Sequence, residues 1–269
     1  MSDINILWLA FIQGFTEFLP VSSSGHLVLF AKYVSQIDQG QAIDIALHLG
    51  SLIAVCLYFS HTIKEMVYSL WQQKFRPNFD VLGVKIAYFI LIATIPAIII
   101  GGVLSFIGME WIRNTKLIAF LLIFYSILLL YADTSFSTQK TLQDISLKDA
   151  LLIGFAQTLA FFPGTSRSGI TITMGRFLGY NRSEVAKFSM LLSVPSILAA
   201  GVVAYIDLYQ TGDISQLFLG GKAIFWSFIF SLIAIVFMMK WLRTKTFLPF
   251  VIYRIILGIV LLLDGYNFI

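Results

Sequence analysis

The sequence predicts an all-α polytopic membrane protein, with six transmembrane helices and two re-entrant helical hairpins arranged as an inverted-topology repeat. Three observations lead to this fold class. Apolar residues make up 58% of the 269 positions and charged residues only 12%, and a typical soluble domain has about twice that charged share. Long apolar runs recur along the whole chain. Two shorter apolar stretches end in a proline that is followed by small polar residues.

Six apolar runs are long enough to cross a bilayer, because about 20 helical residues span about 30 Å of hydrocarbon. They lie near 43–60, 85–107, 117–132, 186–206, 222–240 and 250–268. This composition excludes an ordinary soluble enzyme, a disordered chain and a nucleic-acid binder. Cys56 is the only cysteine in the sequence and lies inside an apolar run, which excludes a disulfide-stapled secreted domain.

Residues 4–18 and 150–162 are apolar but too short to cross a bilayer at about 1.5 Å per helical residue. Each runs into a helix-breaking turn, Pro-Val-Ser-Ser-Ser-Gly at 20–25 and Pro-Gly-Thr-Ser-Arg-Ser-Gly at 163–169. We therefore expect each stretch to be the first arm of a re-entrant hairpin. The second arms are expected at His26–Val34 and Ile170–Leu178.

Lysine and arginine predict the orientation, because they accumulate in cytoplasmic loops. Basic loops lie at 61–85, 176–187 and 240–249, and the loops at 108–116 and 207–221 are poorer in basic residues. Six crossings and two hairpins put every basic loop in the cytoplasm, together with 133–149, and both termini outside. The N-terminus has no basic segment or small-residue cleavage site, so we do not expect a removable signal peptide.

The two proline-terminated segments resemble each other. At an offset of 143, Phe18, Pro20 and Ser23 fall on Phe161, Pro163 and Ser166, and one inserted residue then puts Gly25 on Gly169. Three crossings follow each segment, and an odd number inverts the second half. We expect one membrane domain over 1–269 that contains inverted repeats at approximately 1–135 and 145–269. The tips of the two hairpins then meet near the midplane around a buried polar pocket.

The first tip contributes an acid, three serines at 22–24 and a histidine. Gln13 and Glu17 lie one turn apart and share a helix face. Facing lipid would cost Glu17 at least ~2.5 kcal/mol, so we expect it to face the pocket. There it meets a cation, a metal or a hydrogen-bond donor, although a neutral acid bonded between helices is also open. His26 is close enough to Ser23 to activate a hydroxyl, and Gln13 could instead simply bridge helices.

The second tip, 164–169, has the composition of an anion site. Its polar side chains are Thr165, Ser166, Arg167 and Ser168. A helix is expected to begin near Ile170, so its N-terminus and the Arg167 fork can bind phosphate oxygens together. Arg167 could instead be only an ion-pair partner of Glu17. The two tips combine an acid, hydroxyls, an imidazole and a guanidinium, which suits phosphoryl chemistry.

Three other residues are weaker candidates. Asp44 and His48 lie one turn apart at the start of a span, and we expect them to have structural roles. His61 follows the end of that span beside charged residues and is expected to be solvated.

At the segments 13–26, Gln-Gly-Phe-Thr-Glu-Phe-Leu-Pro-Val-Ser-Ser-Ser-Gly-His, and 163–169, the chain resembles the undecaprenyl pyrophosphate phosphatase family of the bacitracin-resistance type. The resemblance covers essentially the whole chain. It implies hydrolysis of undecaprenyl diphosphate to undecaprenyl phosphate and inorganic phosphate, which recycles the lipid carrier for cell-wall synthesis. It also implies a divalent cation, Mg²⁺ or Ca²⁺, and a site that opens outward from the bacterial cytoplasmic membrane.

The resemblance assigns roles by position. Glu17 matches the second acid of a (Glu or Gln)-x-x-x-Glu motif and is the expected metal ligand, and Gln13 takes the first position. This chain therefore has one acid where some relatives have two. Ser23 and His26 match the proposed nucleophile and its partner, and attack by His26 or water is open too. Residues expected around the diphosphate are Ser22, Ser166, Arg167 and Ser168, and the substrate-binding residues are expected to include Gln13, Ser24 and Thr165 as well. Ser24 stands where some members have threonine.

Other functions fit parts of the same pattern. A transporter or flippase of a phosphorylated polyprenyl lipid would share the inverted-repeat architecture. A phosphatidate-type acid phosphatase is excluded, because no histidine follows His61 in the sequence. The expected partners are a polyprenyl diphosphate lipid and the membrane, without nucleic acid, and a homodimer is left open.

Overall fold

The computed structural model describes residues 2–35, 40–107, 114–136, 138–211 and 217–265. Within these ranges the elements are helices and one isolated bridge between Lys140 and Tyr180. Six helices are long and apolar enough to cross a membrane, which confirms the six predicted runs. They are α3 (Gln41–Tyr58), α5 (Leu82–Ile107), α6 (Thr115–Ser135), α9 (Arg182–Thr211), α10 (Leu217–Trp241) and α11 (Leu248–Gly265).

Some predicted features lie outside the described residues. Most of the loop predicted at 108–116 does, and so do 212–216 of the loop at 207–221 and the end of the span predicted over 250–268.

Four shorter helices occupy the two proline-terminated regions. They are α1 (Asp3–Phe18) with α2 (Ser23–Phe30), and α7 (Leu147–Gln157) with α8 (Arg167–Phe177). A π-helical turn, Ala31–Ser35, extends α2, and a 3-10 turn, Thr158–Phe161, extends α7. The second arms begin at Ser23 and Arg167, earlier than the predicted 26 and 170. The reason is that serines within the tips, not the residues after the glycines, cap these helices.

The region predicted as a basic loop over 61–85 contains a helix that the sequence reading missed. Helix α4 (Ser60–Gln72) begins directly after α3 and has no buried residue. It packs against the start of α5, where Gly83 leaves room for the Ser69 side chain. The segment is amphipathic, with Ile63 and Met66 packed against the core, but it lacks the long apolar run by which the spans were predicted.

The connection predicted over 133–149 is also partly ordered into turns. A 3-10 turn, Leu142–Asp144, begins with a capping box made by Thr141 and Asp144. The backbone N–H and hydroxyl of Thr141 hold the pKa of the Asp144 carboxyl below its usual range, because both donate hydrogen bonds to it. A second capping box, at Ser146, starts α7.

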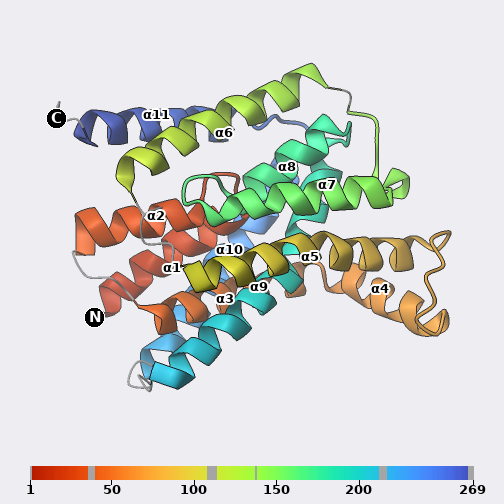
Figure 1. Cartoon of the computed structure of the whole chain (residues 1–269), viewed down its shortest axis with the longest axis horizontal. Coiled ribbons are helices and arrows are strands. Elements are labelled where there is room, and N and C mark those ends of the chain that lie inside the picture. Colours follow the sequence, from red (N-terminus) through yellow and green to blue (C-terminus); the bar gives the residue numbers. More distant parts are fainter. Residues whose placement is uncertain (1, 36–39, 108–113, 137, 212–216, 266–269) are drawn as a thin grey trace.

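One buried core ties the short helices to the spans. It includes Phe18 of α1, Ile172 of α8, Phe188 of α9 and Phe250 of α11. Helix α1 packs along α10, α7 packs along α5, and α3 packs against both α9 and α10. Figure 1 shows α6 and α11 running side by side along one edge of the molecule, and the two helices are in contact. The short helices thus pack against spans on one side, while α1 and α7 also present exposed apolar side chains such as Trp8 and Phe155.

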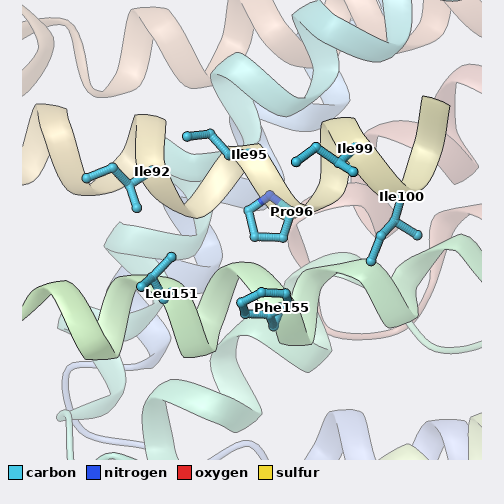
Figure 2. Close-up of a pocket in the computed structure, with 7 residues that line it drawn as sticks. All are labelled: Ile92, Ile95, Pro96, Ile99, Ile100, Leu151 and Phe155. Carbon is cyan, nitrogen blue, oxygen red and sulfur yellow. The ribbon is translucent and has the colours of Figure 1, made fainter. Parts of the chain in front are cut away.

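Many large apolar side chains of the spans are exposed, as expected for helices that face lipid. It includes an apolar groove of about 190 Å³ between α5 and α7. Figure 2 shows its walls, which are Ile92, Ile95, Pro96, Ile99 and Ile100 on α5 and Leu151 and Phe155 on α7. These seven residues include no polar side chain and none of the predicted site residues, so the groove suits an acyl or isoprenoid chain and not a phosphate.

Candidate active site at two helix N-termini

The two tips have the same local backbone. The Ser22 hydroxyl caps α2 by accepting a hydrogen bond from the N–H of Gly25 (3.4 Å), and the Ser166 hydroxyl caps α8 by accepting one from Gly169 (3.1 Å). Both serines have positive φ, 77° and 73°, a conformation that costs free energy for a residue with a side chain. Strain of this kind persists only where the surrounding structure imposes it.

The two caps match in a register one residue away from the predicted alignment. Sequence comparison placed Ser23 on Ser166, whereas the structure makes Ser22 the counterpart of Ser166, because both serines are N-caps. The inserted residue therefore lies between the proline and the capping serine. In this register Gly25 still matches Gly169.

The two tips are in direct contact, as predicted. The backbone N–H of Gly164 donates to the Ser22 hydroxyl (3.0 Å), and the Ser168 hydroxyl donates to the Leu19 carbonyl (2.9 Å). Gly164 has a φ of 98°, and a Cβ there would lie 2.7 Å from the Ile118 carbonyl oxygen, so only glycine fits. The helix N-termini of α2 and α8 are consequently brought together.

Glu17 lies at the centre of the site and is only 8% exposed. Its Oε1 accepts from the Arg167 guanidinium (2.7 Å). Its Oε2 accepts from the Ser23 hydroxyl (2.7 Å) and from the Gln13 amide (3.1 Å). The structure thus brings together four of the predicted residues, from both tips. The ion pair between Glu17 and Arg167, which is the alternative role for Arg167, is present alongside the bond from Ser23 to Glu17.

The Arg167 guanidinium is fixed on two sides. Besides Glu17, it donates to the Ser189 carbonyl on α9 (2.9 Å), and its side chain is 14% exposed. Arg167 is the first residue of α8, so the guanidinium and the free N–H groups of that helix end stand together. A cation at a helix N-terminus is electrostatically unfavourable unless an anion is also present, and Glu17 supplies only one negative charge.

His26 does not have the partner expected from the sequence. Its Nδ1 lies 2.7 Å from the Ser22 carbonyl oxygen, and its Nε2 lies 2.6 Å from the Tyr253 hydroxyl. The expected contact between the imidazole and a serine hydroxyl is therefore replaced by these two contacts. The reason is that α2 begins at Ser23, which turns the Ser23 hydroxyl toward Glu17 and the His26 ring toward α11.

The remaining predicted residues differ in burial. Thr165 and Ser166 are buried, Ser168 is buried and shares a hydrogen bond with Ser166 (3.2 Å), and Ser24 is exposed. Burial thus places the side chains of the second tip inside the site and leaves the Ser24 side chain at its outside.

Sequence reasoning missed Arg254. This residue of α11 is fully buried and donates to three carbonyls, those of Pro20 (3.1 Å), Gly164 (2.9 Å) and Thr165 (3.0 Å). One guanidinium therefore holds both tips. The signal that could have found it is an arginine inside the last predicted span, since a charge at that depth is costly unless it is bonded.

His48, predicted to be structural, reaches the edge of the site. Its Nε2 is 3.9 Å from Glu17 Oε2, and its Nδ1 is 2.8 Å from the Asp44 carbonyl oxygen. His61, by contrast, is exposed beside Glu65, as predicted.

A second buried ion cluster lies outside the site. Asp133 Oδ1 accepts from Arg176 Nε (3.1 Å) and from Arg182 Nε (2.7 Å), and Asp133 Oδ2 accepts from the Phe247 N–H (3.3 Å). The cluster joins α6, α8 and α9 to the start of α11. These donors occupy both carboxylate oxygens and come from separate helices, so we assign the cluster to helix packing.

The residues around Glu17 fit a divalent cation only in part. Gln13 Oε1 is buried and has no hydrogen-bond partner among the described residues, which leaves one oxygen ligand available beside Glu17. The described residues contain no group of three acids, histidines or cysteines that could hold a metal. This donor set suits a hard cation that takes most of its oxygens from phosphate and water, as Mg²⁺ does.

Six apolar spans surround a buried acid, hydroxyls and a guanidinium. This arrangement defines a membrane protein whose polar site contains groups that can bind phosphate. The family model described as "Bacitracin resistance protein BacA" matches residues 6–260, and the chain belongs to this family. It is 42% identical to the undecaprenyl-diphosphatase of Jannaschia sp. (strain CCS1) over 267 residues, which is 99% of this chain and 100% of that protein. It is 43% identical to the undecaprenyl-diphosphatase of Alteromonas mediterranea over 264 residues, which is 97% and 98% of the two chains.

A further relative, the undecaprenyl-diphosphatase of Ruegeria pomeroyi, is 42% identical over 268 residues, which is 99% of this chain and 100% of that protein. The family and the six apolar helices together make this a multi-pass protein of the bacterial inner membrane.

Proposed function

We propose that this protein hydrolyses undecaprenyl diphosphate to undecaprenyl phosphate and inorganic phosphate, and so returns the lipid carrier to cell-wall synthesis. The observation that carries the proposal is the bonding of Glu17 to both Ser23 and Arg167 where two helix N-termini meet. Phosphoryl transfer needs a nucleophile, a group that accepts its proton and a cation that stabilises the phosphate charge. A hydroxyl bonded to a carboxylate beside a guanidinium provides all three. The names of the full-length relatives support the same substrate.

The proposed topology is an inverted repeat of two re-entrant hairpins, α1–α2 and α7–α8. Two features support it: the matching serine caps, and the packing of α1 along α10 and of α7 along α5, since α10 and α5 are each the second span of their half. Each half then runs from a hairpin through three spans. The distribution of basic loops further supports a site that opens to the extracytoplasmic side, with both termini on that side.

Substrate binding is proposed to rely on the second tip. The terminal phosphate would take hydrogen bonds from the Arg167 fork, from backbone N–H groups at the start of α8, and from the hydroxyls of Ser166 and Ser168. The polyprenyl tail stays in lipid or in a groove between helices. Ser22 has a supporting role at the other tip, because its hydroxyl caps α2 and accepts from Gly164.

The proposed nucleophile is Ser23. Its oxygen attacks the terminal phosphorus while its proton passes to Glu17 along the 2.7 Å hydrogen bond, and the anhydride P–O bond breaks to release undecaprenyl phosphate. Water then attacks the phosphoserine while the Tyr253 hydroxyl turns away from His26 Nε2, which accepts a proton from the water. Glu17 returns its proton to the Ser23 oxygen as the P–O bond to serine breaks, and inorganic phosphate leaves. Ser23 is favoured over His26 as the attacking group because its hydroxyl is already bonded to a carboxylate that can take its proton.

We also propose that a divalent cation, Mg²⁺ or Ca²⁺, accompanies the diphosphate, with Gln13 Oε1 and Glu17 as its protein ligands. When bound, it supplies neutralisation of phosphate charge. The single acid at this site means that phosphate oxygens would complete its coordination, so the cation is expected to bind more tightly with substrate than without it.

The test is phosphate release from a polyprenyl diphosphate by the purified protein in detergent, with and without a chelator. Ser23→Ala should lower turnover by at least about 100-fold, because it removes the nucleophile. Ser24→Ala is the matched control, since it deletes the hydroxyl of the exposed neighbour, and should stay within about twofold. Absence of phosphate release from the native protein would reject the hydrolase, and near-normal turnover of Ser23→Ala would reject serine attack.

A further inference from the structure

His48 on α3 has a ring nitrogen that no described residue bonds. Its Nδ1 is 2.8 Å from the Asp44 carbonyl oxygen, which can only accept a hydrogen bond, so in the neutral ring Nδ1 carries the hydrogen and Nε2 the lone pair. Nε2 has no hydrogen-bond partner among the described residues and faces Glu17 Oε2 at 3.9 Å. His26 differs, because its Nε2 is already bonded to the Tyr253 hydroxyl. His48 therefore presents an available lone pair to the acid of the site.

The contact between His48 and Glu17 calls for a positive charge. A ring lone pair and a carboxylate oxygen repel each other, and a cation that binds both removes the repulsion. Two ligands that each lie about 2.0–2.2 Å from one divalent ion are at most about 4.4 Å apart, whereas an N–H···O hydrogen bond is about 2.7–3.2 Å long. The observed 3.9 Å is within the first limit and outside the second range. The spacing therefore suits a shared cation better than a direct hydrogen bond.

Gln13 independently indicates a cation at the same oxygen. Its Nε2 donates to Glu17 Oε2 (3.1 Å), and its Oε1 is buried without a hydrogen-bond partner among the described residues. A half-turn of the amide exchanges these two atoms. Oε1 then faces Glu17, and Glu17 Oε2 regains the lone pair that accepted the amide hydrogen. Such a set of lone pairs is repulsive by itself and favourable around a cation, and the Ser23 hydrogen bond to Glu17 is kept.

We propose that His48 Nε2 is a third protein ligand of the divalent cation, beside Glu17 Oε2 and Gln13 Oε1. This inference rests on the proposed function, which places a cation at Glu17 and Gln13. The set combines one acid and one histidine with an amide, so it is not a group of three acids, histidines or cysteines. The Asp44 carbonyl orients the ring through Nδ1–H, in the way that backbone carbonyls commonly orient histidines that bind metals.

A nitrogen ligand changes which cations the site prefers. Ca²⁺ and Mg²⁺ bind oxygen ligands, whereas first-row transition ions such as Co²⁺ and Zn²⁺ also bind imidazole. His48 should therefore contribute to the affinity for Co²⁺ and contribute little to the affinity for Ca²⁺. A residue that only supports the fold would affect both ions alike, so the ratio of the two affinities separates the two roles.

The experiment measures metal binding to the full-length protein in detergent, after chelator treatment and without substrate. Calorimetric titrations with Co²⁺ and with Ca²⁺ give the two affinities. His48→Phe keeps a ring and removes both nitrogens, and we expect it to weaken Co²⁺ binding at least about tenfold and Ca²⁺ binding less than about twofold. His61→Phe is the matched control, because His61 also lies beside a glutamate, Glu65 (3.5 Å), but is exposed on α4. It should change neither affinity.

Proton NMR of the Co²⁺-loaded protein detects the ligand directly. Co²⁺ is paramagnetic, so a bond to Nε2 should shift the Nδ1–H resonance of His48 far from the other protein signals. This resonance should exchange with D₂O and should be absent in His48→Phe. His48→Gln is a second variant that keeps an oxygen ligand, so it should retain Ca²⁺ binding and lose the shifted resonance.

Each outcome decides the inference. Selective loss of Co²⁺ affinity, together with loss of the shifted resonance in both His48 variants, supports it. The inference is overturned if the native protein binds no Co²⁺, if Co²⁺ and Ca²⁺ binding weaken equally in His48→Phe, or if the resonance persists without His48. Because no substrate is used, a native protein that binds Co²⁺ through His48 but releases no phosphate would reject the hydrolase alone. Phosphate release by a protein that binds no Co²⁺ would reject the His48 ligand alone.

Discussion

The two tips have one backbone and two chemistries. Each has a serine with positive φ as the N-cap of a helix, with a glycine N–H donating to that serine. At the first helical position the first tip has Ser23 and the second has Arg167. Three positions later the first tip has His26 and the second has Ile170. The two tips therefore share a backbone conformation and differ in their side chains at these two positions. The first tip carries the groups for attack, and the second carries the group that stabilises charge.

This difference teaches that the site needs both tips in contact. The nucleophile candidate, Ser23, is bonded to a carboxylate whose other oxygen is bonded to the cation of the opposite tip. The one acid of the site is Glu17, which precedes the first turn on α1 and is bonded to both tips. Interfering with one tip should consequently affect the other, and the expected effects can be ranked.

Removing the cation of the second tip should have the largest effect. Arg167→Ala is expected to lower kcat/KM by about 10³-fold, because an arginine that stabilises transferred phosphate is worth that much or more. Arg167→Lys keeps the charge without the planar fork and should recover only part of the loss. Phosphate-release kinetics measure both. Activity of Arg167→Ala within tenfold of native would show that the second tip has no electrostatic role.

Neutralising the acid that joins the tips should come next. Glu17→Gln keeps the shape but cannot accept the Ser23 proton, and it leaves Arg167 without its ion-pair partner. We expect a loss of about 100-fold in kcat. Glu65→Gln on α4, an exposed acid, is the control. A native rate in Glu17→Gln would mean that Ser23 is activated by another group.

Loosening the clamp between the tips should mainly affect stability. Arg254→Lys cannot reach all three carbonyls that the guanidinium bonds, and the buried carbonyls left unpaired should cost roughly 3 kcal/mol in total. The midpoint of thermal unfolding in detergent is the readout, and the exposed Arg243→Lys provides the comparison. Equal midpoints for both variants would rule out a clamp.

The two caps offer the sharpest comparison. Ser22→Ala and Ser166→Ala each remove a helix cap, which costs about 1 kcal/mol. Ser22→Ala should be the more damaging of the two, because the Gly164 N–H also loses its acceptor, whereas Ser168, the second partner of Ser166, keeps its bond to the Leu19 carbonyl. Thermal unfolding of the two variants, side by side, gives the ranking. The opposite ranking would mean that the bond between the tips contributes little.

The smallest effect is expected from restoring a second acid. Gln13→Glu adds a carboxylate where the unpaired amide oxygen of Gln13 lies. It should lower the Mg²⁺ concentration needed for half-maximal activity roughly threefold. The readout is a Mg²⁺ titration of phosphate release after chelator treatment. An unchanged or higher requirement would argue against a cation at Gln13.

Local sequence was a good guide to the spans and a partial guide to the site. The six apolar runs predicted six helices because burial in lipid depends on length and composition alone. The costs of Glu17 and Arg167 in apolar surroundings likewise pointed to a shared polar centre. Helix α4 was missed because its amphipathic segment is too polar to resemble a span. The cap register was missed because the sequence does not distinguish Ser22 from Ser23, and only the backbone angles do.

By itself, then, the sequence determined that this chain is a helical membrane protein, where its spans lie, and which two turns carry its polar chemistry. These properties follow from short-range composition and from the free-energy cost of placing charge in lipid. Only the tertiary structure decided that Ser23 faces Glu17, that His26 faces Tyr253, and that Arg254 joins the tips. Such contacts depend on helices far apart in sequence, and a hydrogen bond requires positions accurate to a fraction of an ångström.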